Sequence, residues 1–212
     1  QPSSLEFSHF PVMLKEVIQI SSPKKGGLFV DCTFGGGGVS KELLKFSKTN
    51  VIGIDRDSSV VSIARNLKKK YKKRFQFYRL KFSQLDKILV KEVDAFIFDL
   101  GLSSLQLNNL KRGFSFRSKD SLDMNMGLSN LSALDVINNF SEKKLKLIIK
   151  TLGEENDASK IAKNIVRNIL KKKIIRTDEL VKIIEESKKK NFSKKINPST
   201  KTFQALRIFV NK

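Results

Sequence analysis

The sequence predicts an α/β fold in which a doubly wound parallel sheet is followed by an all-helical domain. The first observation behind this prediction is the alternation of short apolar runs with helical patterns before residue 104. The second is the loss of this alternation after residue 104, where a loop is followed by amphipathic segments that suit helices and by no further strand pattern. Right-handed crossovers between parallel strands then place helices on both faces of the sheet.

Four apolar runs bounded by turn residues are the predicted strands, because buried parallel strands are short continuous apolar runs. They lie at 28–31, 51–55, 75–78 and 94–99. The spacing of apolar residues predicts intervening helices at 40–46, 58–71 and 83–90. An open nucleotide-binding sheet normally has more than four strands, and the chain stops at Lys212 where the next strand is expected. We therefore expect a C-terminal truncation.

The second half of the chain carries four amphipathic segments, each preceded by a residue that can cap a helix. They lie at 132–139, 141–152, 157–171 and 177–190. A polar connector with Pro198 separates them from a last apolar helix at 203–210. These segments form a helical module of their own.

Composition narrows the classes of function. The formal net charge of +21 points to a polyanionic partner such as nucleic acid, although solvated lysines on helix faces produce the same excess. No apolar run approaches the roughly 20 residues that cross a bilayer, so no membrane partner is expected. The single cysteine, Cys32, allows neither an intrachain disulfide nor a cysteine metal cluster, and it fits a cytoplasmic location. No metal site is predicted.

A run of glycines directly follows the first predicted strand. Asp31 ends that strand, residues 35–38 are all glycine, and Asp55 ends the second strand about 20 residues later. Glycines let a ligand approach the backbone closely, and the second acid can accept hydrogen bonds from ribose hydroxyls. The pattern suits S-adenosylmethionine or a nicotinamide dinucleotide. Asp31 favours S-adenosylmethionine, because a carboxylate attracts its sulfonium and ammonium groups and repels a pyrophosphate.

Three later segments carry candidate chemistry. Asp99 ends the fourth strand, where its carboxylate either accepts the N–H hydrogen bonds of an exocyclic amine or caps the next turn. Phe82, after the third strand, either stacks on adenine or belongs to the core. The basic loop 111–117 contains Arg112 and two phenylalanines. Phe114 and Phe116 either stack on RNA bases or anchor the loop to the core.

These segments together resemble the bacterial small-subunit ribosomal RNA cytosine-N4 methyltransferases. The motifs that carry the resemblance cover nearly the whole chain and lie at 9–14, 31–40, 55–57, 99–106, 112–116, 122–124, 153–155 and 202–208. The first of them includes the one histidine, His9, for which we expect a structural role. The resemblance implies a Rossmann-like S-adenosylmethionine-dependent methyltransferase domain interrupted by a helical domain. The expected domains are the N-terminal part of the methyltransferase domain at 1–106, the inserted helical RNA-recognition domain at 107–197, and a return helix at 198–212, with the remaining strands absent.

The resemblance also implies an activity, which is methylation of the exocyclic N4 amine of a cytosine in the decoding region of 16S rRNA. The donor-binding residues of the family correspond to Gly37, Gly38, Val39, Asp55, Phe82, Asp99 and Gln106. Val39 stands where the family usually has His, which predicts weaker donor binding.

Asp99 is the expected catalytic residue, and Arg112, Phe114 and Phe116 are the expected substrate-binding residues. The expected partner is 16S rRNA in the small ribosomal subunit, and a homodimer is a further open expectation. The alternative function is a non-catalytic rRNA-binding or ribosome-assembly protein on the same fold, with a dinucleotide-dependent dehydrogenase as a third reading.

Overall fold

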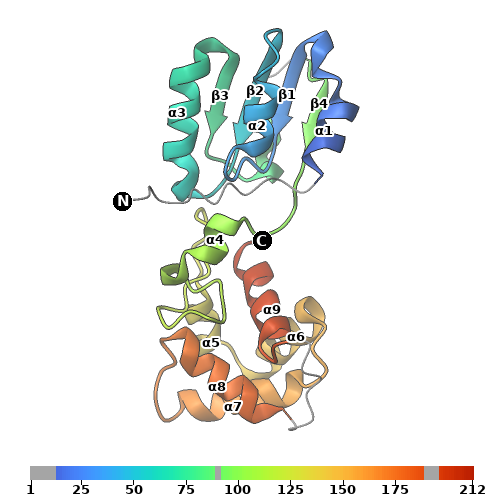
Figure 1. Cartoon of the computed structure of the whole chain (residues 1–212). Helices are drawn as coiled ribbons and strands as arrows, with labels where there is room; N and C mark the ends of the chain where they lie inside the picture. Colours follow the sequence, from blue (N-terminus) through green and yellow to red (C-terminus); the bar gives the residue numbers. More distant parts are fainter. Residues whose placement is uncertain (1–12, 89–91, 189–195) are drawn as a thin grey trace, which may run out of the picture. The chain divides into compact units, whose positions relative to one another are not determined.

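A computed structural model describes residues 13–88, 92–188 and 196–212 of the chain (Figure 1). Most of the motif at 9–14, including His9, lies outside these residues. The chain divides into two compact units, Gln1–Leu105 and Gln106–Lys212. No helix in the described part of the chain combines the length and the apolar character needed to cross a membrane.

The first unit is built on a four-stranded parallel sheet of order β3-β2-β1-β4. The strands are β1 (Gly27–Asp31), β2 (Thr49–Ile54), β3 (Phe75–Tyr78) and β4 (Ala95–Ile97). In the register of the sheet, Phe29 of the central strand pairs with Val51 on one side and Ala95 on the other. All four predicted strands are therefore present, and the α/β fold class is confirmed.

One face of this sheet carries the α-helices of the first unit. Figure 1 shows α1 (Leu14–Ser21), α2 (Gly38–Leu43) and α3 (Val61–Tyr71) on the same side of the strands. Their apolar side chains share one core with alternate residues of the strands, such as Phe29, Val51 and Phe75. The sequence reading missed α1, although Leu14, Val17 and Ile18 have helical spacing and pack against this core.

The opposite face is covered differently from our expectation of a full helix at 83–90. The crossover from β3 to β4 forms a 3-10 helix, η4 (Phe82–Lys87), followed by the buried Ile88. Val30, Ile52 and Ile54 face this side of the sheet, and Leu85 packs against them. The described part of the crossover contains no α-helix, and a few of its apolar residues cover the face.

The strand order contains a reversal that decides where a site can form. The chain leaves β1 toward β2 and β3, and then returns to place β4 on the other side of β1. The carboxyl ends of β1 and β4 are thus the switch point of the sheet, where loops diverge and open α/β folds bind ligands.

The second unit is helical. Helix α4 (Ser104–Asn108) spans the boundary between the units. The α-helices that follow are α5 (Ala133–Asn139), α6 (Glu142–Gly153), α7 (Ala158–Ile169), α8 (Thr177–Ser187) and α9 (Thr200–Val210). Two of the predicted caps are in place: the side chain of Ser132 accepts from the Asp135 N–H, and that of Ser141 accepts from the Lys144 N–H.

Helix α9 differs from our expectation of a return to the methyltransferase domain. It packs against α6 and α5 and clusters with the second unit. The approach of α9 to α6 is so close that a Cβ on Gly153 would lie 2.3 Å from the Lys201 carbonyl oxygen. Asn211, just past the helix, donates to the Met124 carbonyl at 2.7 Å. The periodicity of the sequence predicts an apolar helix here. It does not determine which of the two units this helix packs in.

Candidate active site

Asp31 is a buried carboxylate at the switch point. It ends β1 with about 1% of its surface exposed. One carboxylate oxygen accepts from the Ser40 hydroxyl at 2.6 Å, and the other accepts from the Thr33 N–H at 3.4 Å. Burial raises the pKa of Asp31 to about 6, and the negative charge of Asp55 adds to the rise. Such a group gains from a nearby cation.

The glycine loop after β1 has a strained side and an open side. Gly37 has φ +72°, and a Cβ there would lie 2.8 Å from Cζ of the buried Phe34 ring. Around Gly36, in contrast, nothing lies within 4 Å of the place that a Cβ would take. Glycine at 37 is therefore required by backbone conformation and by packing, and the backbone at 36 is accessible to a ligand.

Asp55 ties the glycine loop to the end of β2. One of its carboxylate oxygens accepts from the Gly35 N–H at 2.8 Å, and the other accepts from the Asp57 N–H at 2.9 Å. Burial raises the pKa of Asp55, while these two backbone hydrogen bonds oppose the rise. Each carboxylate oxygen can accept a second hydrogen bond. Asp55 can thus hold the loop and still accept from the hydroxyls of a ribose.

Asp99 lies just beyond β4, on the other side of the switch point. Its backbone N–H donates to the Thr33 hydroxyl oxygen at 2.7 Å, which joins the end of β4 to the loop after β1. The Asp99 residue is exposed. Two residues on, Gly101 has φ +153° and nothing within 4 Å of its Cβ position. A carboxylate therefore stands beside open space at the carboxyl edge of the sheet.

Two aromatic rings border this edge. Phe82 and Phe98 meet edge to face with their centroids 5.8 Å apart, and they are 47% and 46% exposed. Half-exposed rings of this kind can pack on a planar ligand such as adenine. Phe82 was predicted from the sequence, and Phe98 was not. The alternation of side chains along 94–99 is a signal for Phe98, because it places Phe96 and Phe98 on the same face of the strand, away from Ile97.

Comparison with known proteins gives this site its context. Residues 6–212 match the model of the MraW methylase family. The relatives include proteins named "Ribosomal RNA small subunit methyltransferase H" from Clostridium botulinum (strain 657 / Type Ba4), Rickettsia akari and Sulfurihydrogenibium sp.. They are 43%, 41% and 43% identical over 98%, 96% and 96% of this chain, and over 69%, 67% and 71% of their own lengths.

The chain belongs to the MraW methylase family. It is therefore a methyltransferase, and the methyl donor of this family is S-adenosylmethionine. The carboxyl edge of the sheet fits that donor: Gly36 is accessible, Asp31 offers a negative charge to a sulfonium, and Asp55 and Phe82 suit an adenosine. Within the residues that the structure describes, His, Cys, Asp and Glu side chains form no group of three or more that could hold a metal ion.

The other predicted donor-binding residues of this methylase lie in helices. Gly38 begins α2, and the Val39 side chain packs into the core beneath it. Only the backbone of Val39 is thus offered to a ligand, whatever side chain relatives carry there. Gln106 is buried in α4 of the second unit.

The predicted RNA-binding loop is anchored by the residues that we expected to contact RNA. Phe114 has no exposed surface, and the guanidinium of Arg112 lies 5.1 Å from its ring centre. Arg112 also donates to the Asn125 carbonyl at 2.7 Å. The ring of Phe116 meets Phe203 edge to face at 6.1 Å. The structure therefore favours the anchoring alternative for both phenylalanines. Exposed cations of the loop are Lys111 and Arg117.

Proposed function

We propose that this methylase transfers a methyl group from S-adenosylmethionine to the exocyclic N4 amine of a cytosine in the decoding region of 16S rRNA. The observation that carries the proposal is the arrangement at the carboxyl edge of the sheet. There the Asp99 N–H donates to the Thr33 hydroxyl, and the glycine loop that contains Thr33 is bonded to Asp31 and Asp55. The names of the relatives, which act on ribosomal RNA of the small subunit, support the substrate class. The cytoplasm, where ribosomes are found, is the compartment that this substrate implies.

The donor site in this proposal is made by backbone and carboxylates. The backbone of Gly37, Gly38 and Val39 approaches the donor, and Asp55 accepts from its ribose hydroxyls. Phe82 packs on the adenine. When bound, S-adenosylmethionine would supply an electrophilic methyl group, and Asp31 would offer a negative charge to its cationic groups. Gln106 is the remaining proposed donor-binding residue.

Asp99 is the proposed catalytic residue. Its carboxylate accepts N–H hydrogen bonds from the cytosine amine, which turns the nitrogen lone pair out of conjugation with the ring. The nitrogen would then form a C–N bond as the methyl–sulfur bond breaks, with the electron pair kept by sulfur and S-adenosylhomocysteine as the leaving group. The methylated amine would pass one proton to water. Holding the amine in this orientation is most of the catalysis, because two bound reactants react as one molecule.

The loop 111–117 is the proposed RNA contact of the second unit. Arg112, Phe114 and Phe116 hold its shape, and the exposed Lys111 and Arg117 offer charge to phosphates. A homodimer stays a prediction.

The experiment is methyl transfer from labelled S-adenosylmethionine to small ribosomal subunits that lack the modification. We expect label in 16S rRNA, recovered as N4-methylcytidine after digestion to nucleosides. The Rickettsia akari relative, assayed in parallel, is the positive control. If this chain binds the subunits and transfers nothing while the control is active, the non-catalytic alternative replaces the proposal.

A further inference from the structure

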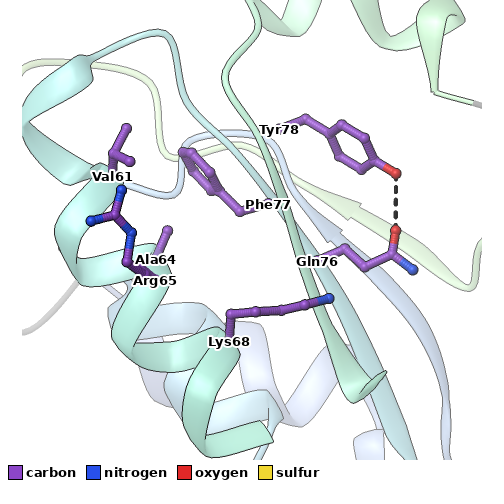
Figure 2. Close-up of a pocket in the computed structure, with 7 residues that line it drawn as sticks. All are labelled: Val61, Ala64, Arg65, Lys68, Gln76, Phe77 and Tyr78. Carbon is purple, nitrogen blue, oxygen red and sulfur yellow. Dashed lines mark hydrogen bonds between the residues drawn. The ribbon is translucent and has the colours of Figure 1, made fainter. Parts of the chain in front are cut away.

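A groove lies between helix α3 and the edge strand β3 (Figure 2). Helix and strand line it together with Val61, Ala64, Arg65, Lys68, Gln76, Phe77 and Tyr78. We call it the α3–β3 groove. Its volume is about 380 Å³, within the range of pockets that hold small ligands, roughly 300–1,000 Å³.

The groove lies in the most uniformly charged part of the chain. Between residues 58 and 85 the sequence has nine Lys and Arg residues and no Asp or Glu. Figure 2 shows Lys68 reaching from α3 toward the strand. Among the described residues, no ion pair involves Arg65 or Lys68. A field of one sign, without neutralising carboxylates, attracts a polyanion.

Aromatic side chains line the strand side of the groove. The ring of Phe77 is fixed edge to face on the buried Phe34 at 5.3 Å, so it forms a rigid wall. Tyr78 is 37% exposed, and its hydroxyl donates to the Gln76 side-chain oxygen at 2.9 Å, as the dashed line in Figure 2 shows. Figure 2 shows the side chains of Tyr78 and Gln76 pointing away from α3, so the exposed ring and the cations of α3 stand on opposite sides of the edge strand β3. A single strand of nucleic acid that crosses this edge can place a base on the ring and its phosphates on the cations.

We propose that the α3–β3 groove is a second contact for single-stranded RNA, next to the proposed donor site at the carboxyl edge of the sheet. The inference rests on the proposed function, because it takes RNA to be the substrate. In the described part of the sheet β3 is also an edge strand, which a peptide could extend by backbone pairing. The charge favours RNA, since backbone pairing requires none.

Binding of a fluorescein-labelled single-stranded RNA, followed by anisotropy between about 50 and 200 mM salt, tests the groove. The double variant Arg65→Glu, Lys68→Glu is compared with Lys24→Glu, Lys25→Glu, which makes the same charge change at two exposed residues of η1 (Pro23–Lys25). We expect the groove variant to bind at least about tenfold more weakly and with a shallower salt slope, by roughly 1.4, since each phosphate contact to a single strand contributes about 0.7. The control variant should retain most of the affinity and the slope.

A neutral pair of variants tests the ring. Tyr78→Leu should weaken RNA binding by roughly fivefold or more without changing the salt slope, because stacking is lost and charge is kept. Tyr78→Phe should retain the affinity of the wild type.

The proposal is overturned if the wild type does not bind the RNA, if groove and control variants lose equal affinity, or if Tyr78→Leu binds like the wild type. Methyl transfer to small subunits, measured on the same preparations, separates the two proposals. If the wild type transfers methyl groups but the groove variants bind RNA as the wild type does, only the groove proposal is wrong. If the wild type transfers nothing but its RNA affinity depends on the groove residues, only the methylation proposal is wrong.

Discussion

Two acids at the carboxyl edge of the sheet and two acids at helix starts of the second unit are held in opposite ways. In the first unit, burial raises the pKa values of Asp31 and Asp55 at the carboxyl edge of the sheet. In the second unit, hydrogen bonds lower the pKa of Asp135, through the Ser132 side chain, and of Glu179, through the backbone of Arg176. Asp135 and Glu179 thus secure helix starts, where negative charge is stabilising. The sheet unit keeps two carboxylates whose charge costs stability, which is expected of a binding site.

The largest effect should come from the exposed acid. Asp99→Ala should reduce methyl transfer to small subunits by about 100-fold or more, because the amine loses its hydrogen-bond acceptor. Stability should change little, since the structural hydrogen bond at this residue comes from its backbone N–H. Asp94→Ala, before the other end of β4, is the matched control. It removes the acceptor of the Leu28 N–H and should lower stability by about 1 kcal/mol while transfer continues. Transfer that survives Asp99→Ala removes the proposed role.

Asp31 should make stability fall as pH rises. Its folded pKa of about 6 lies above the ordinary 3.8, so its contribution is fully present below pH 3.8 and is lost as pH rises through 6. Asp31→Asn should remove this loss, which is worth roughly 3 kcal/mol at about 1.4 kcal/mol per pKa unit. Denaturant unfolding of variant and wild type from pH 4 to 8 measures the difference.

Asp135→Asn in the second unit should change the pH dependence of stability in the opposite direction from Asp31→Asn. The pKa of Asp135 is lowered, so its contribution is present at neutral pH and lost as pH falls. If the difference in unfolding free energy between variant and wild type changes with pH in the same direction for both variants, the two acids are not held in opposite ways.

The glycine loop should respond to substitution at one position and not at its neighbour. Gly37→Ala should lower the free energy of unfolding by about 2 kcal/mol, because the residue has φ +72° and its Cβ meets Phe34. Gly36→Ala has open space and should stay within about 0.5 kcal/mol of the wild type. Chemical denaturation of both variants tests the pair, and equal losses would show that the loop is not held on Phe34.

The smallest effect should come from a helix cap in the second unit. Ser132→Ala removes the side chain that accepts from the Asp135 N–H and should cost about 1 kcal/mol in unfolding free energy. Methyl transfer should be unchanged at a temperature where the protein is folded. A loss of transfer equal to that of Asp99→Ala would mean that the helical unit takes part in chemistry.

The predictable parts of this protein are those that local patterns determine. The four strands follow from continuous apolar runs, and the donor edge follows from glycines and acids at strand ends. The face that Val39 presents could not be predicted, because a short helix after a turn can bury any side. The same holds for Phe114, since aromatic residues in a basic loop suit RNA and core equally. The packing of α9 depends on a close approach at Gly153, which involves residues far apart in the sequence.

We expect the buried Asp31 at the switch point to select a cationic methyl donor. Calorimetric titration of S-adenosylmethionine and S-adenosylhomocysteine into the wild type and Asp31→Asn tests it most directly, because the two ligands differ by the sulfonium charge. We predict that both bind the wild type and that the variant loses about tenfold more affinity for S-adenosylmethionine, or 1.4 kcal/mol. Equal losses for both ligands, or binding of NADH in place of either, would contradict the account.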